Sequence, residues 1–283
     1  MKLILISFWF TAFTLFGCSQ SDRSTESVTA QPRETIAVIG TGDMGDSLGP
    51  RFAELGYKVT YGSRDPARDS VVELVRRTGH GASATTQREA VNDADIVVLA
   101  VPWPPMEQVA QNLGNLDGKI VIDISTPDRQ AEDGYMESLV ETSSGEMIQE
   151  WNPGARVVKT VLVSSIVIDD PTVLGGPMST HIAADDREAK EVVARLVHEM
   201  GLIPVDAGPL RHAREIEGLV RLWYVPILQG RSQTWELALR PNYYWPCIWQ
   251  DDWSEPVGDK EDLAQIPQAE IPRDACSPYL QQQ

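Results

Sequence analysis

The chain has 283 residues, 42% of them hydrophobic, and a formal net charge of −17 at pH 7. That length suffices for one or two packed domains. A surface this acidic repels phosphate backbones, so we expect no nucleic-acid partner. The three cysteines and four histidines lack the spacing of metal ligands, which argues against a structural zinc site.

The chain begins with a segment typical of an export signal. Lys2 precedes an apolar run over residues 3–17, which is short for a membrane span but fits the apolar region of a signal peptide. The run ends in LFGC at Cys18, which resembles a bacterial lipobox. We therefore expect a signal peptide over residues 1–17, a lipid on Cys18, and a membrane-anchored protein in the cell envelope, facing the periplasm or exterior. The alternatives are a plain secretory signal and an uncleaved anchor with the domain facing the cytoplasm.

The polar residues 18–34 are expected to form a solvated tether. If Cys18 carries lipid, Cys247 and Cys276 remain. In an oxidising compartment they could form a disulfide that adds ~3 kcal/mol of stability. They could equally stay apart, because spacing alone does not show that two thiols meet.

A dinucleotide-binding pattern starts at Thr35. The run TIAVI is typical of a strand buried on both faces. A G-x-G-x-x-G turn follows, then an amphipathic helix that ends near Gly56, then a second strand, YKVTYGS. The glycines of the turn permit the tight bend, the approach of backbone to a pyrophosphate, and helix–strand packing. The turn could also serve packing alone. The predicted cofactor-binding residues of this turn are Gly40, Thr41, Gly42, Asp43, Met44 and Gly45.

The end of the second strand decides between NADP and NAD. Ser63 can bond a 2′-phosphate, and Arg64 offers a planar fork for that phosphate, with Arg68 nearby. Asp65 could instead be the acid that binds the ribose in an NAD site. Its place next to Pro66 favours a turn or capping role, so the sequence predicts NADP(H).

The run DADIVVLAVPW predicts another buried strand, from Asp95 to Val101, that stops at Pro102-Trp103. Ligands of open α/β sheets bind beyond the carboxyl ends of strands. Trp103 is therefore expected to touch the nicotinamide half of the cofactor or, alternatively, to cover the sheet edge. The next strand and loop are KIVIDISTP, residues 119–127.

The motifs GTGDMG, YGSRDP, AVPW, DISTP, SSGEMIQEWNPGARVVK and PVDAGPL occur in one order between Thr35 and about Ala238. In this they resemble the NADPH-dependent reductases of the 8-hydroxy-5-deazaflavin coenzyme F-420 (F420), and also the cytoplasmic domain of STEAP metalloreductases. The resemblance implies that the turn cradles the pyrophosphate and that Val101, Pro102 and Trp103 border the nicotinamide half. It also implies that a deazaflavin or flavin stacks on the nicotinamide.

The expected fold is α/β: a Rossmann-type doubly wound parallel sheet, then a smaller α/β domain with a long C-terminal helix. A clean apolar stripe over residues 189–200 predicts a helix before the strand IPVDA, and a long helical stretch starts at Leu210, interrupted by Pro226. In chain order, the expected domains are a signal peptide (1–17), a tether (18–34), an NADP-binding domain (35–155), a smaller domain (156–240) and an aromatic-rich extension (241–283). That extension is expected to cover an apolar surface or to act as a substrate lid.

The sequence departs from the family where the redox partner is expected. Relatives often have Asn before Pro127 and Ala-Phe-Asn after Lys159, whereas this chain has Thr126 and continues TVLVSS. Lys159 is expected to approach the cleft or, as is more common at a strand end, to be solvated. His181 and His212 are candidate proton donors to a different substrate, or structural residues.

These observations favour an NADP(H)-dependent oxidoreductase acting on a small-molecule redox partner, with the cofactors carrying the chemistry and no catalytic side chain named. The sequence has no match to the catalytic-lysine motif of β-hydroxyacid dehydrogenases. The alternative is an envelope-located nucleotide-binding module without turnover, because NADPH is scarce outside the cytoplasm. A homodimer is one expected assembly.

Overall fold

The computed structural model describes residues 33–161, 165–232 and 264–267, which belong to one compact unit, residues 33–283. The predicted signal peptide, the lipidation site Cys18 and the pair Cys247 and Cys276 lie outside the described residues. Within these ranges no helix is both long and apolar enough to cross a membrane.

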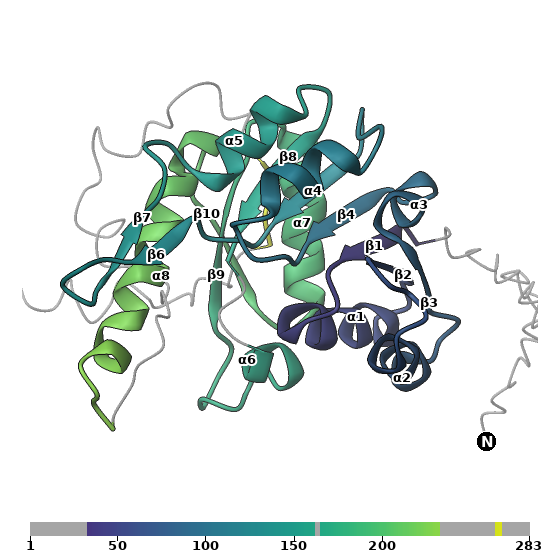
Figure 1. Cartoon of the computed structure of the whole chain (residues 1–283), viewed down its shortest axis with the longest axis horizontal. Coiled ribbons are helices and arrows are strands. Elements are labelled where there is room, and N and C mark those ends of the chain that lie inside the picture. Colours follow the sequence, from purple (N-terminus) through teal and green to yellow (C-terminus); the bar gives the residue numbers. More distant parts are fainter. Residues whose placement is uncertain (1–32, 162–164, 233–263, 268–283) are drawn as a thin grey trace, which may run out of the picture. The chain divides into compact units, whose positions relative to one another are not determined.

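An eight-stranded sheet runs through the unit in the order β10-β9-β8-β5-β4-β1-β2-β3 (Figure 1). Its strands are β1 (Thr35–Ile39), β2 (Lys58–Ser63), β3 (Ser83–Thr86), β4 (Ile96–Leu99), β5 (Ile120–Asp123), β8 (Arg156–Thr160), β9 (Ser179–Ala183) and β10 (Ile203–Asp206). The short strands β6 (Asp128–Gln130) and β7 (Met136–Ser138) form a separate antiparallel pair.

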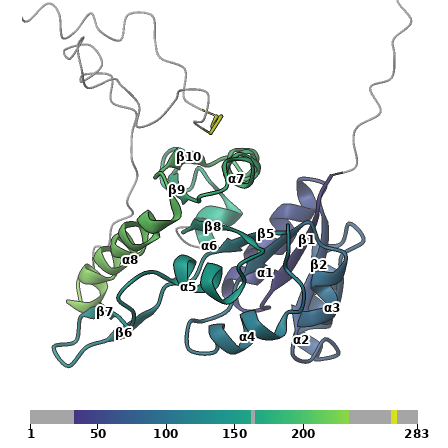
Figure 2. The same cartoon turned by 90° about the horizontal axis from the view of Figure 1, so that it is seen from above.

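Helices cover both faces of the sheet (Figures 1 and 2). They are α1 (Asp43–Glu54), α2 (Asp69–Thr78), α3 (Gln87–Asn92), α4 (Met106–Asn112), α5 (Ser144–Trp151), α6 (Ser165–Asp169), α7 (Arg187–Glu199) and α8 (Ala213–Leu228), with a 3-10 turn at Leu210–His212. Alternation along the strands assigns side chains to the two faces, because successive residues of a strand point to opposite sides. In β1, Ile36 and Val38 join the cluster with α1, α2, α6 and α7, while Ala37 and Ile39 join the cluster with α3, α4 and α5.

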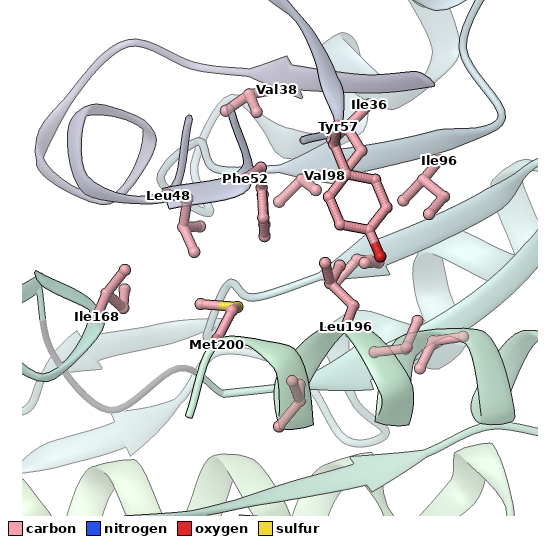
Figure 3. Packing of buried hydrophobic residues seen from close by; sticks show 14 of the residues in the cluster. Ile36, Val38, Leu48, Phe52, Tyr57, Ile96, Val98, Ile168, Leu196 and Met200 are labelled. Carbon is pink, nitrogen blue, oxygen red and sulfur yellow. The ribbon is translucent and has the colours of Figure 1, made fainter. Parts of the chain in front are cut away.

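The first of these clusters packs helix α1 against helix α7. Leu48 and Phe52 of α1 point toward Leu196 of α7 and toward Met200, which directly follows α7 (Figure 3). All four side chains are at most 2% exposed. Each such side chain contributes ~1.5–3 kcal/mol when buried, so this contact between distant parts of the chain is a major source of stability.

The strand order creates a crevice at one edge of the sheet. Strand β1 pairs in parallel with β2 on one side and with β4 on the other. The chain order therefore reverses between β1 and β4, and in open α/β sheets ligands bind beyond the carboxyl ends of the strands at such a point. Strand β9 pairs antiparallel to β8, which brings its amino end, at Ser179, to the same edge.

The predicted α/β class, the mostly parallel Rossmann-type sheet and the C-terminal helix are confirmed. The domain boundary after residue 155 stays a prediction, and no break in the sheet marks it, since β8 pairs with β5. The predicted interruption at Pro226 is wrong, because α8 continues through Pro226 to Leu228. The β6–β7 pair was not predicted; it lies beside α8 (Figure 2), and Arg221 of α8 pairs with Asp128 of β6 at 2.8 Å.

Candidate functional site

Two glycines of the turn after β1 are required by close packing. Gly40 has φ +117°, and a Cβ there would overlap the carbonyl oxygen of Ala100, which follows β4. A Cβ on Gly45 would overlap the carbonyl oxygen of Gly40. Only glycine fits at both places without a shift of backbone, so this turn is held directly at the point where the strand order reverses.

Gly42 differs, because a Cβ there would meet no described heavy atom within 4 Å. Gly42 is also the residue before the first turn of α1, and no side chain of the described residues caps that helix. The first N–H groups of a helix have no partner within the helix and attract anions. The open space at Gly42 and the uncapped α1 therefore fit a bound pyrophosphate.

The cationic residues predicted for the 2′-phosphate lie at the carboxyl end of β2. Arg68 donates a hydrogen bond from Nη2 to Oγ1 of Thr41 at 3.3 Å, which links it to the glycine turn. Arg64 is exposed and makes no hydrogen bond or ion pair within the described part of the chain. Both guanidinium groups therefore suit an incoming phosphate.

Ser63 and Asp65 form a turn next to these arginines. The Ser63 hydroxyl donates to the carbonyl oxygen of Asp65 at 3.1 Å and accepts from its N–H at 3.2 Å. Asp65 accepts in turn from the N–H of Ala67 at 3.2 Å. The prediction that Asp65 is a turn residue is confirmed, whereas the phosphate contact of Ser63 stays a prediction, since its hydroxyl is engaged in the turn.

Val101, Pro102 and Trp103 follow β4 at the same edge of the sheet. The Trp103 ring stacks on Trp151 of α5, with centroids 5.7 Å apart and 24° between the planes. It packs against the second core cluster together with Val101. This is the predicted alternative in which Trp103 covers the sheet, and contact with the nicotinamide stays a prediction.

A cavity of about 460 Å³ opens beside the glycine turn. It starts at Asp43 and Met44 and extends past the ends of β5 and β8 and the start of β9 to helix α8. The lining residues are Asp43, Met44, Ile124, Thr126, Val161, Ser165, Ser179, His181, Ile216, Leu219, Val220, Trp223 and Tyr224. The cavity is therefore continuous with the start of α1 and large enough for a planar ring.

Helix α8 supplies the longest wall of this cavity. Its five lining residues recur at helical spacing, i, i+3, i+4, i+7 and i+8: Ile216, Leu219, Val220, Trp223 and Tyr224. Residues with this spacing lie on one face of a helix. The sequence predicts this helix, and the spacing of these five residues is the signal that could have indicated that one face of it lines a cavity.

The two candidate histidines have different surroundings. His181 of β9 lines the cavity, and burial lowers the pKa of its imidazole, so the ring is neutral at pH 7. His212 makes a hydrogen bond from its Nδ1–H to the carbonyl oxygen of Ala207 at 2.5 Å. The contact of His212 is therefore that of a structural residue, which was the alternative prediction. His181 is the candidate histidine that lines the cavity beside the glycine turn.

Lys159 corrects a prediction, because its side chain is fully buried rather than solvated. Its Nζ lies 3.0 Å from Oδ2 of Asp123 and 3.3 Å from Oε1 of Glu217. It also donates to Oγ of Ser144 at 2.8 Å and to the carbonyl oxygen of Ser125. Sequence analysis missed this buried cluster, in which β8, β5, α5 and α8 each contribute a polar side chain.

Glu217 is the unusual member of the buried cluster. Burial, the largest cause, raises the pKa of its carboxyl group, while Lys159 and Ser144 act in the opposite direction. Ser144 has one hydroxyl hydrogen yet contacts both Glu217 and Asp123, so it can donate to only one of them. Burial favours the neutral form of Glu217, so its carboxyl group takes up a proton more readily than that of an exposed glutamate.

Residues 35–127 match the protein family described as "NADP oxidoreductase coenzyme F420-dependent". The F420-dependent NADP reductase of Methanothermobacter thermautotrophicus is 32% identical over 205 residues, which are 66% of this chain and 86% of that one. The chain belongs to the F420-dependent NADP reductase family. The family is one of NADP-dependent oxidoreductases, and NADP is its cofactor.

The chain is also similar to other proteins. Metalloreductase STEAP3 of Rattus norvegicus is 30% identical over 211 residues, 72% of this chain, but the chain spans only 41% of that relative's length. A structure from Arthrobacter sp. FB24, described as a candidate F420-dependent NADP reductase, superposes with a TM-score of 0.64 at 29% identity, covering 71% of this chain and 96% of that one. The imine reductase of Myxococcus stipitatus, bound to NADP+, shares the fold at 18% identity, with a TM-score of 0.53 over 69% of this chain and 63% of that one.

Proposed function

We propose that the protein transfers hydride between NADP(H) and a planar, flavin-like or deazaflavin ring that stacks on the nicotinamide in the cavity beside α8. The observation that carries this proposal is the continuity of the cavity with the start of α1. A nucleotide whose pyrophosphate lies at Gly42 would extend from there along the same edge of the sheet.

The residues of the chain bind and orient rather than react. Gly42 and the start of α1 would hold the pyrophosphate, and Arg64 and Arg68 the 2′-phosphate. When bound, NADPH supplies the hydride, and the chemistry is that of the cofactor. Helix α8 would press the partner ring toward the nicotinamide through its apolar stripe and keep water away, which supplies proximity and orientation.

We also propose, from the LFGC sequence at Cys18, that a lipid anchors the protein in the cell envelope, facing the periplasm or exterior; a tether that faces the cytoplasm is the alternative. A homodimer stays a prediction.

The scarcity of NADPH outside the cytoplasm favours the second candidate function, a nucleotide-binding module without turnover. Measuring oxidation of NADPH by an acceptor distinguishes the oxidoreductase from the module without turnover.

The first test is a fluorescence titration of the full-length, detergent-purified protein with NADPH and NADH. We expect NADPH to bind more tightly than NADH, and Arg64→Ala and Arg68→Ala each to weaken NADPH binding by about tenfold, since charge-assisted bonds to phosphate are lost. Arg76→Ala is the matched control, because this exposed arginine of α2 pairs, among the described residues, only with Glu73. Absence of NADPH binding would refute the proposal, and tight binding without oxidation by any planar acceptor would favour the module without turnover.

A further inference from the structure

The wall of the cavity suits a ring without charge. Most of its lining residues are apolar or aromatic, including Met44, Ile124 and the stripe of α8. Apolar and aromatic walls with a few polar groups are typical of small-molecule sites. They favour a flat aromatic ring as the ligand.

The charges of the cavity disfavour an anion. Among the described lining residues, Asp43 is the one that carries charge at neutral pH, and its charge is negative. His181 is neutral there, because burial lowers its pKa. The side chain of coenzyme F420 bears a phosphodiester and carboxylates, which Asp43 would repel. Arg64 and Arg68 would offset such repulsion for NADP(H), but the described lining of the cavity holds no Lys or Arg that would offset it for F420.

The polar groups of the wall suit a ligand with carbonyl oxygens. The Trp223 Nε1–H is buried and has no hydrogen-bond partner among the residues that the structure describes. A buried donor without a partner is costly, and an acceptor on a ligand would remove that cost. The neutral ring of His181 of β9, which also lines the cavity, offers a second N–H.

We propose that the partner of this cavity is an uncharged planar ring with carbonyl oxygens, of the quinone class, rather than the anionic deazaflavin coenzyme. This inference rests on the proposed function, because NADPH supplies the electrons. NADPH loses a hydride and becomes NADP+, and the quinone gains that hydride and one proton from solvent to become the hydroquinone. Trp223 and His181 would bond the carbonyl oxygens, and Asp43 would select against anions.

The test is equilibrium binding to the full-length protein by calorimetry, with and without NADP+, so that no reaction occurs. The two main probes are 2-(hydroxymethyl)anthraquinone and anthraquinone-2-sulfonate, which share a ring and differ in charge; F420 is the third. We expect the neutral quinone to bind about tenfold more tightly than the sulfonate. Asp43→Asn should reduce that preference to about threefold, because the repelling carboxylate is removed.

Trp223→Phe keeps an aromatic ring and deletes the N–H, so the neutral quinone should bind about fivefold to tenfold more weakly. Trp151→Phe is the matched control, since Trp151 stacks on Trp103 and does not line the cavity. This variant should bind the neutral quinone with the affinity of the wild type. Equal affinity for the two quinones, tighter binding of F420, or an unchanged affinity in Trp223→Phe would overturn the proposal. NADPH titration of the same samples tests the proposed function separately, so the two failures can be told apart.

Discussion

Replacing Lys159 by methionine tests whether the buried cluster stabilises the fold. The substitution keeps an unbranched side chain of nearly the same length but leaves Asp123 and Glu217, both fully buried, without their cation. Removing one partner of a buried ion pair costs ~3–5 kcal/mol. We expect about 3 kcal/mol, at the lower end, because the raised pKa of Glu217 lets that carboxyl group take up a proton instead of staying charged.

The assay is urea unfolding at neutral pH, with the free energy and its slope fitted separately. Lys159→Met combined with Asp123→Asn should recover at least half of the loss, because a fully neutral cluster lacks the uncompensated charge. Lys190→Met is the control: Lys190 pairs with Asp206 at 2.9 Å, but that carboxylate is 33% exposed, so the cost should be about 1 kcal/mol or less. A loss below 1 kcal/mol for Lys159→Met, or no recovery in the double variant, would refute the reasoning.

Three further predictions concern the turn, the cluster and the anchor. Gly45→Ala should lower the free energy of unfolding by ~1–3 kcal/mol, since the added methyl group meets the backbone of Gly40. Gly42→Ala should leave urea unfolding unchanged and weaken NADPH binding about tenfold. Equal effects of the two substitutions on the free energy of unfolding would contradict this. Because the folded pKa of Glu217 is raised above 4.5, the wild type should lose stability relative to Glu217→Gln as pH rises from 4.5 through the folded pKa; parallel pH profiles would disprove it. Cys18→Ser should move the protein from the membrane fraction to the soluble fraction and abolish its lipid in mass spectrometry; an unchanged distribution would contradict the lipid anchor.

The sequence predicted the sheet well because its strands carry continuous apolar runs, and a run such as IVVL of β4 is buried at every position. It did not predict β6 and β7, whose sequences DRQ and MES show no apolar alternation. Their pairing depends on packing against α8, which periodicity does not report. The glycine turn and the arginines could also be predicted, because they lie close together in the sequence and form local motifs.

The buried cluster was beyond the reach of local patterns. Ser144 and Glu217 meet although 73 positions separate them. Lys159 did carry a signal, because it follows Val157 by two positions in β8, so both point to the same buried face. A lysine at that place predicts a buried cation, but only the fold shows which carboxylates accompany it.

The separation of the site between two parts of the chain has a consequence for how such a protein can diversify. The glycine turn, β2 and the arginines lie before residue 70, whereas the residues that line the cavity come largely from β9 and α8. Glu217 fixes α8 to the core from another side of the helix than the one that faces the cavity. Exchanges at Ile216, Leu219 or Trp223 can therefore reshape the cavity without touching the glycine turn or the arginines. If the cavity holds the electron acceptor, as proposed, a few substitutions on one helix suffice to change which acceptor binds.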